Sequence, residues 1–463
     1  MKANAAKSIK VVSTAHGTND RLTVKGDLSF KEDKKGVETP LIVLYEDVKY
    51  QEIVGFGGAF TESGAYALDK MSRAKRDEII NAYFNPHTGI GYNFCRTHIN
   101  SCDFSLKNYN YLEADGDVEL KSFSVANDDE HLIPFIKDAL KINGGIKLFA
   151  SPWSPPGWMK TSGTMNNGGK LKEEYKQVWA SYVAKYIKEY AGRGIKIWGI
   201  TVQNEPKATQ TWDSCVYTAE DERDYVRDHL GPTLQKEGLS DVKIMIWDHN
   251  KERLYERSSV AYADPEASKY IWGTGFHWYS GEHFEALSAF HDRFPDKNLV
   301  FTEGCEGPDT TVPGVKGWGN YSGKLGYWVA GEKYARDIIG DLNNWTVGFT
   351  DWNMVLDEKG GPVHDGNFCG APIIADTASD TVLYKSSYYY IGHFSKYIKR
   401  GARRIAFSRF SDVLDVTAFE NPDGQFVVVV MNRNDTEVKA ILKCRYGIAD
   451  IAAKPHSIMT LLY

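Results

Sequence analysis

Residues 197–206 have the sequence Ile-Trp-Gly-Ile-Thr-Val-Gln-Asn-Glu-Pro, an apolar run that ends in polar residues. A short apolar run bounded by a turn signal is typical of a buried parallel strand. Pro206 prevents a regular continuation because it has no backbone N–H to donate. We therefore predict a buried strand that carries Asn204 and Glu205 at its carboxyl end.

Seven similar runs occur along the chain, with helical stretches between them, which is the pattern of consecutive βα units. Eight parallel strands are the number that closes a (β/α)8 barrel. The predicted strands are residues 54–60, 92–99, 146–150, 197–202, 242–247, 273–278, 299–302 and 347–352. The predicted fold class is therefore α/β, a TIM barrel.

The clearest helical pattern covers residues 171–191, where apolar side chains recur every three or four residues. Gly192 and Gly194 follow it, as expected at a helix end. We interpret the apolar stripe as a core face that packs on the strands.

Both ends of the chain have a different pattern, of short alternating strands. Residues 413–419 and 426–431 flank an Asn-Pro-Asp-Gly turn at 421–424, and residues 9–14, 21–25 and 41–45 also resemble strands. We predict a discontinuous β-sandwich domain of residues 1–47 plus 402–463 and a catalytic barrel of residues 48–401.

The amino-acid composition indicates which partners and cellular locations to expect. The 463 residues are 42% hydrophobic and 25% charged with a net charge of −6, which gives no reason to expect a nucleic-acid partner. No apolar segment is long enough to predict membrane insertion, and the first residues lack the apolar core of a signal peptide. We expect a cytoplasmic protein, or a secreted one if a native signal has been trimmed. Six dispersed cysteines are expected to be mostly reduced thiols: Cys95, Cys102, Cys215, Cys305, Cys369 and Cys444.

Two glutamates end predicted barrel strands. Glu205 follows the fourth strand, and Glu303 follows the seventh and precedes Gly304. Strand ends converge at one mouth of a barrel, and glycoside cleavage requires a carboxylic acid and a carboxylate that face one another. We expect burial and the like charge of Glu303 to raise the pKa of Glu205, so that Glu205 is the acid. Asn204 is placed to hydrogen-bond a sugar hydroxyl.

The sequence resembles glycoside hydrolase family 30, the group that includes lysosomal glucosylceramidase and bacterial relatives. The resemblance covers nearly the whole chain through the motifs Gly-Phe-Gly-Gly-Ala-Phe-Thr-Glu (55–62), Ser-Pro-Trp-Ser-Pro-Pro (151–156), Thr-Val-Gln-Asn-Glu-Pro (201–206), Phe-Thr-Glu-Gly (301–304) and Asp-Trp-Asn (351–353). It implies a retaining double displacement with Glu205 as acid/base and Glu303 as nucleophile. It also implies a barrel joined to a sandwich built from both chain ends.

Further positions match the sugar-binding motifs of that family, and each has a chemical rationale. A carboxylate can accept from two adjacent sugar hydroxyls, indole rings can wall a pocket, and a tyrosine or arginine can lower the pKa of the nucleophile. The matching residues are Arg96, Asp103, Trp153, Asn204, Tyr279, Trp352 and Asn367. His277 is more often a hydrogen-bonded structural histidine, and we interpret it so.

Other chemistries lack their motifs. Phe60 occupies the place of the third glycine of a dinucleotide fingerprint, and Gly169 stands where a phosphate loop needs lysine. The chain contains neither HExxH nor GxSxG. We expect no cofactor and no metal. The leading hypothesis is hydrolysis of terminal β-linked glucose. The alternatives are an endo-β-1,6-glucanase, a β-xylosidase or β-fucosidase, an inverting hydrolase, and a carbohydrate-binding protein without catalysis.

Overall fold

The computed structural model describes residues 7–308 and 324–463. Within the chain, contacts define two compact units. One contains residues 56–319 and 348–383, and the other contains residues 1–55, 320–347 and 384–463. The predicted boundaries after residues 47 and 401 stay predictions, and the helical segments 328–343 and 386–395 fall in the second unit.

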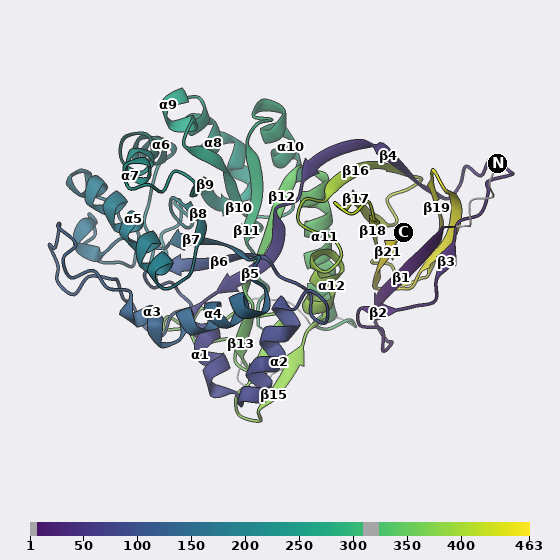
Figure 1. Ribbon diagram of the computed structural model, residues 1–463, viewed down its shortest axis with the longest axis horizontal. Coiled ribbons are helices and arrows are strands. Elements are labelled where there is room, and N and C mark those ends of the chain that lie inside the picture. The colour runs from purple at the N-terminus through teal and green to yellow at the C-terminus, as the bar shows by residue number, and fades with distance from the viewer. Residues whose placement is uncertain (1–6, 309–323) are drawn as a thin grey trace. The chain divides into compact units, whose positions relative to one another are not determined.

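Eight strands form a closed barrel in the order β10–β11–β12–β5–β6–β7–β8–β9 (Figure 1). Each predicted run overlaps one of them, so the predicted fold class is confirmed. Every residue of β5, β6 and β12 is buried, including polar residues of β6 and β12 such as Arg96 and Asp351. The barrel strands are β5 (Gly55–Phe60), β6 (Phe94–Ile99), β7 (Lys147–Pro152), β8 (Ile197–Thr201), β9 (Lys243–Asn250), β10 (Ile271–His277), β11 (Asn298–Glu303) and β12 (Thr346–Asn353).

The glycines of β5 allow the neighbouring strand to approach closely. A Cβ atom on Gly57 would lie 1.9 Å from the carbonyl oxygen of Phe94 in β6, and one on Gly58 would lie 2.5 Å from Met354 Cγ. Side chains cannot occupy these positions without moving the backbone. The glycine-rich motif at residues 55–58 therefore serves barrel closure.

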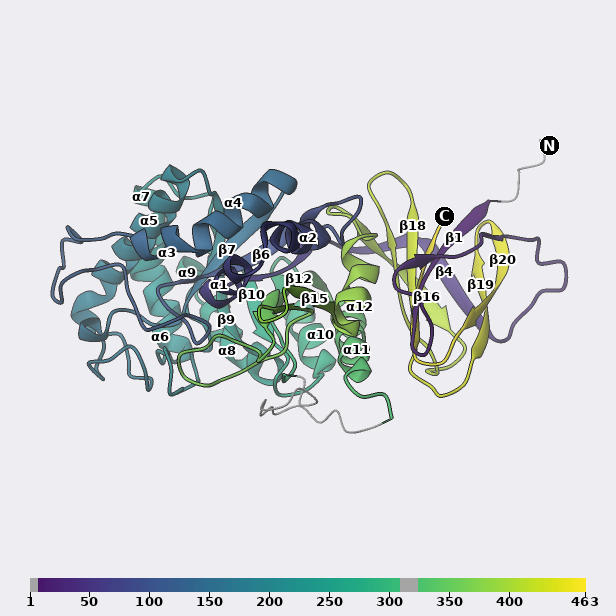
Figure 2. The same cartoon turned by 90° about the horizontal axis from the view of Figure 1, so that it is seen from below.

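Helices connect the barrel strands and lie on the outside of the barrel (Figures 1 and 2). They are α1 (Glu62–Lys70), α2 (Arg73–Phe84), α3 (Ala126–Glu130), α4 (Leu132–Ile142), α5 (Lys176–Gly192), α6 (Ala219–Tyr225), α7 (Gly231–Lys236), α8 (Leu254–Tyr262), α9 (Pro265–Ser268) and α10 (Phe284–Arg293). Single turns η1 (Gly157–Met159), η2 (Glu173–Tyr175) and η4 (Lys251–Arg253) and a π-helical turn η3 (Val226–Leu230) interrupt the connections. A small sheet is formed by β13 (Val355–Asp357), β14 (Ile373–Asp376) and β15 (Thr381–Tyr384).

Helix α5 has the predicted core face but a later start. Its apolar stripe, including Trp179, Tyr182 and Tyr186, is buried. The prediction that it begins at residue 171 is wrong, because Leu171 forms a β-bridge with Lys160 and residues 173–175 form the turn η2. The backbone hydrogen bonds of this bridge hold residues 170–172 extended.

A buried carboxylate joins α3 to α5 and to the loop that follows β6. Asp128 Oδ1 accepts from the hydroxyl of Tyr109 at 2.8 Å, and Oδ2 accepts from Tyr111 at 2.6 Å and from Tyr190 at 2.7 Å. Asp128 is 1% exposed. Three hydrogen bonds to a charged acceptor compensate for its removal from water.

The second unit contains a β-sandwich whose strands come from both ends of the chain. They are β1 (Ser8–Ala15), β2 (Thr23–Val24), β3 (Leu28–Ser29), β4 (Leu41–Glu52), β16 (Arg403–Arg409), β17 (Asp415–Glu420), β18 (Phe426–Asn432), β19 (Val438–Cys444), β20 (Gly447–Ala453) and β21 (Ser457–Leu462). Strand β1 pairs antiparallel with β21, with Val11 opposite Leu461, and β4 lies between β16 and β19 (Figure 2). The predicted sandwich from both chain ends is confirmed.

Two helices, α11 (Trp328–Asn343) and α12 (Ser386–Ser395), belong to the same unit. His393 of α12 is fully buried and bonds one strand from each chain end, Thr14 of β1 at 2.9 Å and Thr460 of β21 at 2.8 Å. Among the helices that the structure describes, none combines the length and apolarity needed to cross a bilayer.

Candidate active site

Glu205 and Glu303 reach the same end of the barrel from opposite sides. Glu303 is the last residue of β11, and Glu205 lies in the loop that follows β8. Glu205 has a positive φ of 46°, a conformation that costs a non-glycine residue energy. Its N–H donates to the carbonyl oxygen of Asp248 at 2.9 Å, which helps to hold the strained backbone in place.

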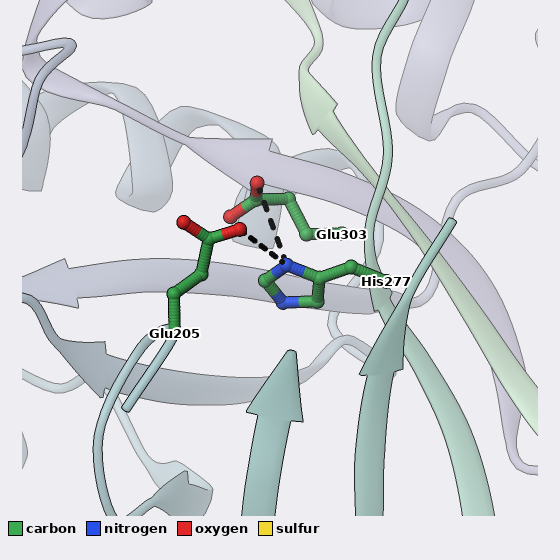
Figure 3. A group of neighbouring side chains, drawn as sticks. All are labelled: Glu205, His277 and Glu303. Carbon is green, nitrogen blue, oxygen red and sulfur yellow. Dashed lines mark hydrogen bonds and ion pairs between the residues drawn. The ribbon is translucent and has the colours of Figure 1, made fainter. Parts of the chain in front are cut away.

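The Nδ1 atom of the His277 imidazole faces both carboxylates (Figure 3). His277 Nδ1 is 3.3 Å from Glu205 Oε1 and 3.8 Å from Glu303 Oε1. His277 Nε2 is 3.0 Å from Asp248 Oδ1. One atom from each of Glu205, His277 and Glu303 lies within 4.8 Å of the others. His277 is therefore part of the site, whereas its sequence suggested a structural role.

Arg96 and Tyr279 hold Glu303 from two sides. Arg96 Nη1 donates to Glu303 Oε2 at 2.6 Å, and the Tyr279 hydroxyl donates to Oε1 at 2.9 Å. Arg96 is fully buried, and its Nη2 also donates to Asn204 Oδ1 and to Asp248 Oδ2, each at 2.9 Å. The guanidinium group of Arg96 is held in one orientation by these acceptors, so its bond to Glu303 fixes the position of that carboxylate.

The pKa values differ from the expectation that Glu205 retains a proton near neutrality. Burial opposes the ionisation of Glu205, but the hydrogen bond from His277 and the charges of His249 and His277 together outweigh it and lower its pKa to about 2. Burial raises the pKa of Glu303, against the attraction of His277 and Arg96. Burial also disfavours the imidazolium, yet Glu303 and Asp248 raise the pKa of His277 to about 9. The shared proton therefore resides on His277 at neutral pH.

Polar and aromatic groups face one another across the cavity above the carboxylates. Asn367 Nδ2 donates to Asp103 Oδ2 at 3.1 Å, while Asp103 Oδ1 is buried with no hydrogen-bond partner among the described residues. Burial and the charge of Glu303 hold the pKa of Asp103 well above its usual range. The indoles of Trp153 and Trp352 stack with centroids 5.1 Å apart. This wall combines a hydroxyl acceptor with flat apolar faces.

The cavity has a volume of about 540 Å³. A cavity of about 660 Å³ lies within the sandwich unit, but its lining is aliphatic with lysines and one aspartate, so volume alone does not identify the reactive site. Of the predicted site residues, all but Arg96 line the smaller cavity, and Arg96 lies behind Glu303. The lining residues are Asp103, Trp153, Asn204, Glu205, Lys207, Ala208, Gln210, Trp212, His249, Asn250, Tyr279, Glu303, Cys305, Trp352, Asn367 and Cys369.

The spacing of Glu205, His277 and Glu303 is compatible with a metal site, but their electrostatics are those of an ion-pair cluster. Because its pKa is raised to about 9, His277 would have to release a proton before it could bind a metal. Arg96 already neutralises Glu303. The cluster thus balances its carboxylates with two protein cations.

Several residues of the site were not predicted. Asp248 is buried and bridges Arg96 and His277, and it directly follows the predicted strand 242–247, so the strand-end rule that found the glutamates could have found it. Lys207, Gln210 and Trp212 line the cavity from an irregular loop. No periodicity marks such a loop.

Comparisons with known proteins show which family the chain belongs to. The family model "Glycosyl hydrolase family 30 TIM-barrel domain" matches residues 53–398, and "Glycosyl hydrolase family 30 beta sandwich domain" matches residues 401–461. The chain belongs to glycosyl hydrolase family 30. It is therefore a glycoside hydrolase that binds a carbohydrate substrate.

Relatives extend over nearly the whole chain. Lysosomal acid glucosylceramidase of Mus musculus is 36% identical over 438 residues, which covers 91% of this chain and 83% of that protein. The crystal structure of SrfJ from Salmonella typhimurium superposes with a TM-score of 0.93 at 36% identity and covers 99% of both chains. An endo-β1,6-glucanase structure has a TM-score of 0.86 at 30% identity and covers 98% of this chain and 99% of that chain.

Proposed function

We propose that this family 30 hydrolase is a retaining β-glycosidase in which Glu303 is the nucleophile and Glu205 the acid/base. The separation of the two carboxylates carries the proposal. One carboxylate oxygen of Glu205 lies within 4.8 Å of one of Glu303, which is in keeping with the roughly 5 to 5.5 Å between the carboxyl groups of retaining enzymes and not with the about 6.5 to 9.5 Å of inverting ones. The short separation favours a covalent glycosyl-enzyme intermediate over the inverting alternative.

The hydrogen bonds divide the two roles. Arg96 and Tyr279 both donate to Glu303, which fixes an ionised oxygen for attack on the anomeric carbon. Glu205 contacts His277, whose Nδ1 atom lies 3.3 Å from Glu205 Oε1 and carries a proton in the imidazolium. That proton passes through Glu205 to the leaving oxygen, and the Glu205 carboxylate then deprotonates the water that releases the sugar.

For the substrate, we propose a terminal β-linked glucose. Asp103 offers an unpartnered carboxylate oxygen beside the amide of Asn367, an arrangement that binds adjacent hydroxyls of one sugar ring. Trp153 and Trp352 supply flat faces for the ring, and the mouse relative is named a glucosylceramidase.

An endo-β-1,6-glucanase is the second candidate. It is favoured by the similarity to a solved endo-β1,6-glucanase and by Lys207, Gln210 and Trp212, which extend the cavity beyond Glu205, where a further ring could lie. A β-xylosidase or β-fucosidase would use the same carboxylates and differ in contacts to the ring substituents.

The test is hydrolysis of p-nitrophenyl β-glycosides of glucose, xylose, fucose and galactose and of β-1,6-glucan, with NMR of the first anomer released. We expect turnover of the glucoside with a β product. Glu303→Gln should lower kcat by about 10⁴-fold or more, and the exposed Glu285→Gln should not. An α product would disprove retention, and cleavage of the polymer alone would favour the glucanase.

A second variant tests the acid/base role. Glu205→Ala should still react with the activated p-nitrophenyl substrate, because that leaving group needs no proton, and should then stall as the glycosyl-enzyme. Added azide should restore turnover and give a β-glycosyl azide. Absence of this product in a folded variant would assign the acid/base role to another residue.

A further inference from the structure

Two thiols lie side by side in the wall of the catalytic cavity. Cys305 Sγ and Cys369 Sγ are 3.2 Å apart, and both residues line the cavity. Cys305 follows Glu303 by two residues, and Cys369 follows Asn367 by two residues in the connection from β13 to β14. Both cysteines are free and 3% exposed. The pair thus joins two segments that each carry a residue of the site.

The backbones that carry the two thiols are anchored. The Cys369 N–H donates to the carbonyl oxygen of Gly360 at 3.0 Å, and the indole N–H of Trp278 donates to the carbonyl oxygen of Cys305 at 3.2 Å. The sulfur pair is therefore a fixed feature of the cavity wall.

The pair also contacts the hydrogen-bond network of the nucleophile. Cys305 Sγ lies 3.5 Å from the hydroxyl of Tyr279, the same hydroxyl that donates to Glu303 at 2.9 Å. A chemical change at Cys305 consequently changes the surroundings of a donor to Glu303. It also acts on the segment that holds Asn367 against Asp103.

We propose that Cys305 and Cys369 form an oxidisable dithiol, which a peroxide converts to a disulfide that reversibly stops hydrolysis. The loss of activity rests on the proposed function, whereas formation of the bond does not. A disulfide bond is about 2.05 Å long, so the sulfurs must approach by roughly 1.2 Å. No metal or second protein is needed for this chemistry.

The reaction balances with one peroxide. The Cys305 sulfur attacks one peroxide oxygen, an S–O bond forms as the O–O bond breaks, and water leaves. The Cys369 sulfur then attacks the Cys305 sulfur, the S–O bond breaks, and a second water leaves. Both thiols are oxidised and the peroxide is reduced. A dithiol reductant reverses the process by exchange.

Cys305 is the attacking thiol. Burial raises its pKa, but its thiolate accepts from Cys369, which partly offsets the burial. The pKa of Cys369 is raised further, first because of its contact with Cys305 and second because of burial. Since the thiolate is the reactive form, oxidation should accelerate as the pH rises above neutrality. A sugar bound in the cavity should slow it.

The experiment treats the full chain with hydrogen peroxide and follows three readouts: intact mass, the count of free thiols, and hydrolysis of the best β-glycoside. We expect a loss of two mass units, four free thiols instead of six, and a cross-linked peptide that joins Cys305 to Cys369. Activity should fall at least tenfold and return with dithiothreitol. Cys444→Ser, which removes a thiol of the sandwich unit, should behave as wild type does.

Cys369→Ser separates the disulfide from other oxidation. Measured against its own reduced activity, this variant should give no cross-linked peptide, and dithiothreitol should not reverse its inactivation by high peroxide. The proposal fails if oxidised wild type loses thiols without a Cys305–Cys369 peptide, or if the cross-linked protein hydrolyses its substrate as fast as the reduced one. If no glycoside is hydrolysed at all, the mass readout still decides whether the bond forms.

Discussion

His277 stores the proton that the proposed reaction needs. Its two ring nitrogens contact carboxylates at 3.3 Å and 3.0 Å, and its pKa is raised to about 9 because Glu303 and Asp248 outweigh the burial that opposes the charge. The folded pKa lies above the usual value near 6.5, so the imidazolium persists through neutral pH and is lost as the pH passes about 9.

We therefore expect kcat/KM to fall on the alkaline side near pH 9. In His277→Gln the partner that lowers the pKa of Glu205 is gone, so Glu205 itself must hold the proton and the alkaline limb should move to lower pH. The maximal rate should drop about tenfold or more. Rate measurements from pH 4 to 10 check this. The exposed His87→Gln is the control and should leave the limb in place.

The side chain of Asp103 is proposed to bind the sugar, and its burial lowers the stability of the fold. Burial and the charge of Glu303 raise its pKa well above the usual value. Because the unfolded chain ionises at the usual value, the fold loses stability as the pH rises above about 3.8. Asp103→Asn should raise the melting temperature at pH 7, and the gain should shrink towards pH 4. It should lower kcat/KM by about 10- to 100-fold, because a carboxyl oxygen that accepts from sugar hydroxyls is replaced by an amide nitrogen.

Calorimetry and kinetics on the same samples test this opposition, with the exposed Asp115→Asn as the control. A variant that loses stability as well as activity would show that Asp103 supports the fold rather than the substrate.

At the scale of elements, the short helix α3 is attached to α5 through Asp128. Asp128→Ala would leave two buried tyrosine hydroxyls and one partly buried one without their acceptor, and each unsatisfied buried group costs about 1–3 kcal/mol. We expect the free energy of unfolding to fall by about 3 kcal/mol or more in urea titrations. The neighbouring Asp129→Ala loses only an exposed ion pair with Arg193 and should cost about 1 kcal/mol or less. Equal losses in the two variants would contradict the argument.

The barrel elements were predictable because burial on both faces produces apolar runs that end sharply at polar residues. Residues 197–206 show this for β8. The start of α5 was not predictable, because Leu171 continues the apolar spacing while its backbone pairs with Lys160. Propensity does not reveal such a tertiary bridge.

The site was predictable where residue types at strand ends follow a known motif, as for Glu205 and Glu303. The contact of His277 with both glutamates depends on how three strands converge in the barrel. We expected the proton on Glu205, but the raised pKa of His277 favours the imidazole as its place. The contact of Cys305 with Cys369 joins residues far apart in sequence. Local sequence carries no information about it.

For the whole molecule, the sandwich depends on strands from both chain ends, and His393 bonds to one strand from each. Burial lowers the pKa of His393 to about 3, so the folded form keeps the ring neutral while the unfolded chain takes up a proton below about pH 6.5. Stability should therefore decrease as the pH falls from 6.5 towards 3, by up to about 1.4 kcal/mol per pH unit.

His393→Gln should reduce this acid dependence while lowering stability at pH 7, because an amide can replace the ring at Thr14 or Thr460 but not at both with equal geometry. Guanidinium titrations at pH 4.5 and 7.0 measure the difference. The exposed His87→Gln should keep the wild-type slope between the two pH values. An unchanged slope in His393→Gln would mean that other groups govern acid unfolding.

The pairing of β1 with β21 has a consequence for biosynthesis. A ribosome produces β1 before the barrel, and β21 emerges only after the barrel has been translated. During this interval Val12, which is fully buried in the finished protein and lies opposite Thr460, is without its partner strand. Chaperones that bind extended apolar segments can reach β1 during this interval, and the barrel can fold before β1 pairs with β21.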